Sequence, residues 1–141
     1  MPAAMNRDEA YAFLDSRPGW MQLSTVGGDG YPHTVPVGFF RLGDDLYTGG
    51  REGTQRWKNI ARNPRVGALF ESGSGKQDIK GLLVQGDAEF VTEPSDVLPL
   101  VRESARRRGT PEDELPDEPR PGAAYIRIRP RFISWDYSRE Q

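Results

Sequence analysis

The 141-residue chain has the length of one domain, and its formal net charge of −2 gives no overall attraction for nucleic acid. It contains no cysteine and a single histidine, His33, so disulfides, thiolate nucleophiles and metal centres built from cysteines or several histidines are excluded. No apolar stretch approaches the ~20 residues that span a bilayer, and the first residues have no hydrophobic signal core. We therefore expect a single cytoplasmic domain over residues 1–141, and the modest hydrophobic fraction of 35% favours a dimer.

The N-terminal part of the chain predicts one capped helix and then strands. Asn6 and Glu9 have the spacing of a capping box, so a short helix is expected to follow Asn6. Apolar and polar residues then alternate over 20–25, and Gly-rich turns separate this strand from others over 32–42 and 46–49. We expect these first three strands to form a meander.

The middle of the chain predicts a second helix and two strands. Thr54 is a suitable N-cap for a helix over 54–61. Strands are expected over 66–71 and 80–92, and two glycines within the second of these mark bulges or barrel bends.

The C-terminal part predicts a helix, a loop and two strands. A helix is expected over 94–108 and an exposed acidic, proline-rich loop over 109–122, which is a candidate lid. Two final strands over 125–129 and 131–137 are expected to be broken at Pro130. Together the elements predict a mainly β fold with a few short helices, in which six to seven antiparallel strands form a closed or nearly closed barrel.

The glycine-rich segment 47–59 has the features of a phosphate site. It leads from a strand into a helix whose first turns offer backbone N–H groups and a partial positive charge. Thr54 can donate a hydroxyl hydrogen bond, and Arg56 can bind two phosphate oxygens, with Lys58 nearby. The alternative is a capped surface helix with solvated basic residues.

A second candidate region pairs Ser24 and Thr25 with residues 33–37, where small hydroxyl side chains and Pro36 can lie beside a flat ring. The alternative is that these are ordinary strand residues. His33 is a candidate general acid or haem ligand, or else a packed polar residue. Trp135 is expected in the core or across a dimer interface. The arginines 106–108 are expected to be a solvated helix end that suits the helix dipole.

Four segments together resemble the pyridoxamine-phosphate-oxidase-like, FMN-binding split β-barrel proteins, including their deazaflavin (F420)-dependent branch. The first joins LSTV (23–26) with DGYPHTVPV (29–37), and the others are DLYT (45–48), GTQRWKNIARNPRV (53–66) and KGLLVQGDAEFV (80–91). The resemblance implies a six- to seven-stranded antiparallel split β-barrel. It also implies a homodimer with the cofactor at the subunit interface.

The resemblance also implies the positions of the cofactor-binding residues. Thr54, Arg56 and Lys58 stand where relatives hold the phosphate. Val35, Pro36 and Val37 stand where relatives flank the flavin ring. Tyr47 and Thr48 offer backbone contacts, and Trp135 is the candidate contributed by the second subunit. No catalytic acid or base is implied, because the cofactor supplies the hydride chemistry.

The expected function is an FMN-dependent oxidoreductase, with F420 as the alternative cofactor, acting on a small organic substrate. The substrate-binding pattern of a vitamin B6 oxidase is missing near the C-terminus, so that activity is not expected. A flavin- or haem-binding carrier or sensor on the same barrel is the alternative function. An oligonucleotide-binding barrel is a third interpretation, which the acidic balance and the lack of neighbouring exposed aromatics disfavour.

Overall fold

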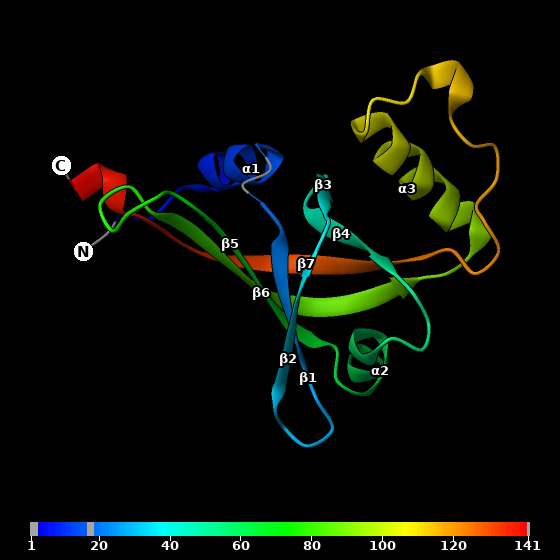
Figure 1. Ribbon diagram of the computed structural model, residues 1–141, viewed down its shortest axis with the longest axis horizontal. Coiled ribbons are helices and arrows are strands. Elements are labelled where there is room, and N and C mark those ends of the chain that lie inside the picture. Colours follow the sequence, from blue (N-terminus) through cyan, green and yellow to red (C-terminus); the bar gives the residue numbers. More distant parts are fainter. Residues whose placement is uncertain (1–2, 17–18, 141) are drawn as a thin grey trace.

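The computed structural model describes residues 3–16 and 19–140 as a curved seven-stranded antiparallel sheet with three α-helices (Figure 1). The helices are α1 (Arg7–Asp15), α2 (Gln55–Arg62) and α3 (Pro94–Arg107). The strands are β1 (Met21–Val26), β2 (Pro32–Val37), β3 (Phe40–Leu42), β4 (Asp45–Gly50), β5 (Arg65–Ser72), β6 (Lys80–Val91) and β7 (Ala124–Asp136). Two 3₁₀ turns span Glu112–Glu114 and Tyr137–Glu140.

The strand order β2-β1-β5-β6-β7-β4-β3 confirms the predicted antiparallel split barrel, although the sheet is not closed. The predicted meander is wrong, because β2 pairs with β1 and β3 pairs with β4 at opposite ends of the sheet. The apolar pattern over 32–42 runs through a break in the strand at Gly38-Phe39. Phe39 is buried there and packs edge-on against Phe70, with ring centroids 4.6 Å apart. Burial of this ring therefore redirects the chain from one sheet edge to the other.

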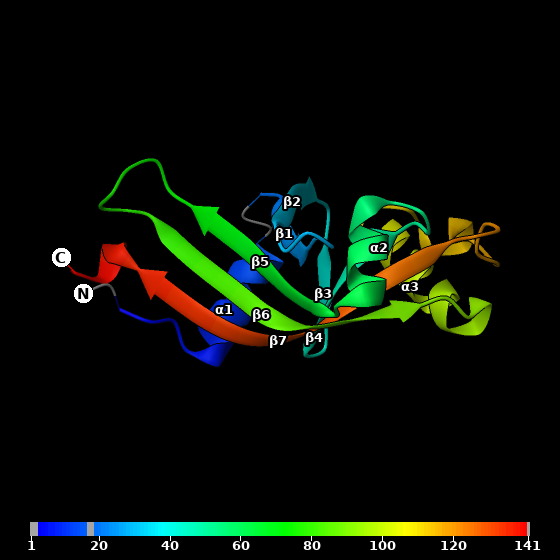
Figure 2. The ribbon, with the colours of Figure 1, turned by 90° about the horizontal axis from the view of Figure 1, so that it is seen from below.

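Strands β6 and β7 form the long central pair of the sheet (Figure 2). The predicted break at Pro130 is wrong, since the pairing stays in register from Lys80↔Asp136 to Val91↔Tyr125. Pro130 lies opposite Gly86, where a Cβ atom would lie only 2.2 Å from the Arg129 carbonyl oxygen. Because the register is continuous, this glycine accompanies a close backbone approach rather than a bulge.

The main core lies between the sheet, α1 and α2. Leu14 of α1 and Ile60 of α2 are buried against strand residues that include Leu23, Phe70 and Ile128. A second cluster seats α3 through Val97 and Leu100 on the other side of β4, and it includes Phe40, Tyr47 and Val91. Each helix therefore covers a different part of the sheet (Figure 1). No helix within residues 3–16 and 19–140 has the length and apolar character needed to cross a bilayer.

Helix starts follow the predicted caps. The Asn6 side chain accepts the Glu9 N–H at 2.9 Å, and the Glu9 carboxylate accepts the Asn6 N–H, which confirms the capping box. Thr54 caps α2 as predicted. The expected exposure of the 109–122 loop is confirmed for its acidic residues, but Leu115 is only 5% exposed and anchors the loop.

Candidate functional site

A cavity of about 550 Å³ lies between the end of β2, strand β4, the start of α2 and the C-terminal half of α3. Its walls are rich in aromatic rings, contributed by Trp20, Phe39, Phe40, Tyr47 and Tyr125. Two guanidinium groups, those of Arg56 and Arg108, are its charged groups, and no carboxylate from the described part of the chain lines it. An aromatic cavity with only positive charge suits a flat ring that carries an anionic group.

The structure brings five of the nine predicted site residues to this cavity, namely Pro36, Val37, Tyr47, Thr48 and Arg56. They come from β2, β4 and α2. Four strands separate β2 from β4 in the sheet, and α2 lies outside the sheet. Val35, Thr54, Lys58 and Trp135 are not in its lining.

The aromatic wall is ordered by ring contacts. Phe40 stacks on Tyr47 with centroids 5.4 Å apart and 17° between the planes. Tyr125 meets Phe40 edge-on, with centroids 6.0 Å apart. Phe40 and Tyr47 are buried in one cluster with Val97 and Leu100 of α3, and this packing holds the wall in place.

Thr48 ties β4 to the end of β2. Its side chain is buried, and its hydroxyl donates a hydrogen bond of 2.7 Å to the carbonyl oxygen of Gly38. The bond joins two segments that lie in different parts of the sheet, so Thr48 fixes the relative position of two sides of the cavity.

Arg56 places the charge on the α2 side of the cavity. One terminal nitrogen donates to the carbonyl oxygen of Gly49 at 3.3 Å, whereas its buried Nε has no hydrogen-bond partner in the structure. The described residues offer Arg56 no ion pair. A buried N–H without an acceptor is unfavourable, so this guanidinium is suited to an added anion.

Helix α2 itself is anchored by its neighbours. Trp57 stacks on Phe90 with ring centroids 3.7 Å apart, and Asn59 is fully buried with its amide donating to Thr25 at 2.9 Å. These contacts place Arg56 at the cavity rather than leaving it on a mobile surface helix.

Three other predicted residues have different positions. The Thr54 hydroxyl accepts the Trp57 N–H at 3.4 Å and donates to the Arg51 carbonyl at 2.9 Å, so capping already uses it. Lys58 is exposed, and residues two apart on a helix face different sides, so it does not share the cavity with Arg56. Val35 lies opposite the buried Leu23 and therefore faces the core side of β2.

Trp135 is the second-last residue of β7, and Figure 2 shows that β7 ends near the C-terminus, away from α2 and α3. Its ring covers Gly81 on β6, where a Cβ atom would overlap the indole. Within one protomer Trp135 is therefore remote from the cavity near α2.

Sequence reasoning did not assign Ser104 and Arg108 of the α3 end to a site, but both line the cavity. Their i, i+4 spacing was a usable signal, because it places them on the same helix face. What the sequence did not reveal is which way α3 docks. That orientation depends on the packing of Val97 and Leu100 against β4.

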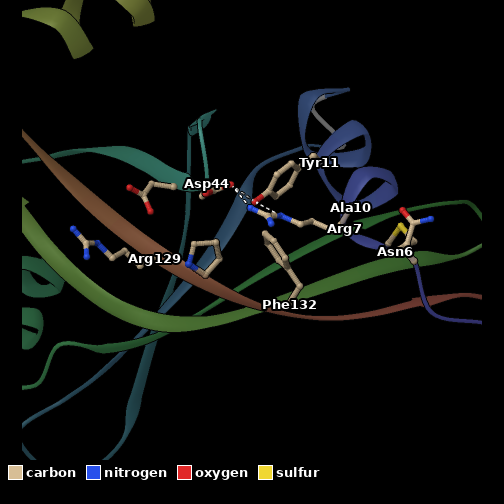
Figure 3. Close-up of a pocket in the computed structure, with 10 residues that line it drawn as sticks. Asn6, Arg7, Ala10, Tyr11, Asp44, Arg129 and Phe132 are labelled. Atoms are coloured by element: carbon tan, nitrogen blue, oxygen red, sulfur yellow. Dashed lines mark hydrogen bonds and ion pairs between the residues drawn. The ribbon is translucent and has the colours of Figure 1, made fainter.

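Other cavities have a different character. One of about 560 Å³ lies between α1 and the β3–β4 turn (Figure 3). There Tyr11 donates to Asp44 at 2.7 Å, and this bond together with Arg7 lowers the pKa of Asp44. Another of about 890 Å³ on the sheet surface mixes arginines with Asp87 and Glu89. In both of these cavities the arginines lie with carboxylates, so neither combines an aromatic wall with positive charge alone.

His33 is half-buried on β2, opposite Thr25, and its Nδ1 atom is buried without a hydrogen-bond partner. It is not part of the lining of the aromatic cavity. The structure therefore keeps His33 apart from Arg56 and the ring wall.

Comparison with solved structures supports the fold. The chain is similar to a conserved hypothetical protein of Mycobacterium tuberculosis (24% identity, TM-score 0.80), covering 94% of this chain and 86% of the other. It is similar to a protein described as an F420 reductase (27%, TM-score 0.67; 89% and 97% covered). It is also similar to HutZ, the haem storage protein of Vibrio cholerae (20%, TM-score 0.70; 92% and 93% covered).

None of the curated proteins compared with the chain matches it significantly. The family model described as pyridoxamine 5'-phosphate oxidase matches residues 7–131, which include every residue that lines the aromatic cavity. The chain therefore belongs to the pyridoxamine 5'-phosphate oxidase family.

Proposed function

We propose that this protein is an oxidoreductase that binds FMN or the deazaflavin F420 in the aromatic cavity. The observation that carries the proposal is Arg56, whose buried Nε lacks a hydrogen-bond partner in a cavity to which residues 3–16 and 19–140 contribute no carboxylate. Family membership and the likeness to an F420 reductase support the same class of ligand.

The residues present fit a phosphorylated flat ring. Arg56 and the backbone around Gly49 would hold the phosphate, and a Cβ atom at Gly49 would meet nothing within 4 Å, so that side of the loop is open to a ligand. Pro36, Val37 and the Phe40–Tyr47 wall would position the ring.

A bound flavin or deazaflavin supplies the hydride chemistry, and the protein supplies binding and orientation. Arg56 would neutralise the phosphate, and Thr48 holds β4 against the end of β2. The aromatic side chains would shield one face of the cofactor ring from water, which would strengthen each polar contact to the cofactor.

We also propose a homodimer with the cofactor at the subunit interface, as the family resemblance implies. Trp20 is 67% exposed at the cavity, and Trp135 lies at the opposite end of β7 from Tyr125, which lines the cavity. A partner's Trp135 is the candidate to complete the site. Analytical ultracentrifugation of the wild type should show a dimer, and a monomer that binds FMN with full affinity would contradict this arrangement.

Titration of the purified protein with FMN and with F420, followed by fluorescence, tests the proposal. Saturable binding of one of them is expected. Anaerobic reduction of the bound cofactor followed by mixing with menadione, a two-electron acceptor, should then reoxidise it. Failure of both cofactors to bind would remove the proposed function, and binding without any reoxidation would favour a carrier.

A haem-binding role is the second candidate, since the buried Nδ1 of His33 lacks a partner and one similar structure is a haem storage protein. This role predicts a Soret band with haemin that disappears in His33→Ala. A Soret band that survives this substitution would exclude His33 as the axial ligand.

A further inference from the structure

Helix α3 ends in three consecutive arginines that have different surroundings. Arg106 pairs with Glu103 at 2.8 Å and with Glu112 at 2.5 Å. Arg107 pairs with Glu103 at 2.9 Å and also donates to the carbonyl oxygen of Arg41 at 2.8 Å. These two guanidinium groups are therefore compensated by carboxylates or held by the backbone.

Arg108 differs from both of its neighbours. Its Nη1 donates to the Ser104 hydroxyl at 2.8 Å, and among the described residues it has no carboxylate partner. Ser104 and Arg108 both line the aromatic cavity. The Ser104 contact restrains the guanidinium while leaving most of its N–H donors available.

Two uncompensated guanidinium groups consequently share one cavity, entering it from α2 and from α3. Like charges in a confined, partly apolar space repel one another, and bound anions remove that repulsion. The two positions are not equivalent. The Nε of Arg56 is buried at the start of α2, whereas Arg108 is exposed at the end of α3. The buried position suits a ligand that stays bound, and the exposed one suits a ligand that exchanges with solvent.

We propose that Arg108, oriented by Ser104, binds an anionic group of the substrate, so that this enzyme acts on a small aromatic or conjugated acid. The assignment to a substrate rests on the proposed function, in which Arg56 holds the cofactor phosphate. The ring wall of Phe40, Tyr47 and Tyr125 provides the apolar contact for the rest of such a molecule.

The test uses benzoate and benzamide, which have the same shape but differ in charge. Their binding to the full-length protein is followed by tryptophan fluorescence, to which Trp20 in the lining of the same cavity contributes. The wild type should prefer benzoate. Arg108→Gln should weaken benzoate binding about 5- to 10-fold. This is less than the full value of a charge-assisted hydrogen bond, because solvent screens the charge of an exposed arginine. Benzamide binding should not change, and Arg108→Lys should restore part of the preference.

Arg106→Gln is the matched control, because it removes the same charge two residues before Arg108, at a position that does not line the cavity. It should leave benzoate binding unchanged. Thermal melts of all variants identify any that fail to fold, and Ser104→Ala, which keeps both charges, should weaken benzoate binding about 2-fold by releasing the guanidinium.

The outcomes separate this inference from the proposed function. Loss of FMN or F420 affinity in Arg108→Gln equal to that in Arg56→Ala would assign Arg108 to the cofactor and overturn the inference. Equal binding of benzoate and benzamide by the wild type would also overturn it. If neither cofactor binds but benzoate still depends on Arg108, the anion position holds and its assignment to a redox substrate fails.

Discussion

Gly86 lies directly opposite Pro130 in the β6–β7 pair, and a Cβ atom on Gly86 would lie 2.2 Å from the carbonyl oxygen of Arg129. That oxygen belongs to the backbone of a central strand, so it moves only if the strand moves. The close approach explains how β7 passes through a proline without leaving the sheet, since neither residue adds bulk between the two strands.

Gly86→Ala should therefore lower the free energy of unfolding by about 2–3 kcal/mol, as expected for a steric conflict with fixed backbone. Urea denaturation measures the change. Gly67→Ala on β5 is the control, because its Cβ would meet its nearest neighbour, the Val84 carbonyl oxygen, at an ordinary 3.9 Å. Equal stability of the two variants would show that the β6–β7 pair has room for a side chain.

Arg56→Ala should weaken binding of FMN or F420 by about 1.5–3 kcal/mol, the range for hydrogen bonds to a charged group. Arg56→Lys should lose less, because it keeps the charge but not the two-pronged geometry. Isothermal titration at low salt measures both. Lys76→Ala, in the exposed β5–β6 turn, removes a charge elsewhere and should change nothing. Unchanged affinity in Arg56→Ala would mean that the phosphate lies elsewhere.

Asn59→Ala should destabilise the fold by about 1–3 kcal/mol, because the side chain is fully buried and its loss leaves polar groups without partners. Asn59 donates to Thr25 at 2.9 Å and accepts from Gln55 at 2.8 Å. A double-mutant cycle with Thr25→Val should show coupling of the two residues. Additive effects of the two substitutions would argue that the bond between α2 and β1 contributes little.

Glu103 gives a prediction for the pH dependence of stability. The hydrogen bond from Arg107, with a second one from Arg106, lowers the pKa of Glu103 below its ordinary value of 4.5. A lowered carboxyl pKa in the folded state stabilises the protein above the ordinary value, and this stabilisation disappears as the pH falls through the lowered value. Glu103→Gln should thus lose about 0.5–1 kcal/mol at pH 7 and progressively less below pH 4.5.

Urea denaturation of the wild type and Glu103→Gln between neutral and acidic pH checks this expectation. Glu114→Gln, on the exposed 3₁₀ turn, serves as the control and should follow the wild type throughout. A stability difference that grows on acidification would have the wrong sign for an ion-paired carboxylate.

The helices and most strands could be predicted from the sequence because their signals act over a few residues. Asn6 with Glu9 and Thr54 with the Trp57 N–H satisfy backbone donors within one turn, so neighbouring residues specify where α1 and α2 begin. The alternating pattern over β1 indicated a strand, and the order of the four family segments indicated an antiparallel split barrel.

The tertiary structure alone decided which edges of the sheet β2 and β3 occupy and which arginines share a cavity. Arg56 and Arg108 meet the same space because Val97 and Leu100 dock α3 on β4, while Trp57 and Asn59 dock α2 on the opposite side. Such placements depend on packing between segments that are distant in the chain. Because the hydrophobic effect is non-directional, a local sequence pattern does not specify which distant apolar residues pack together. The charges of the site were therefore visible in the sequence, but their convergence followed only from how the helices pack.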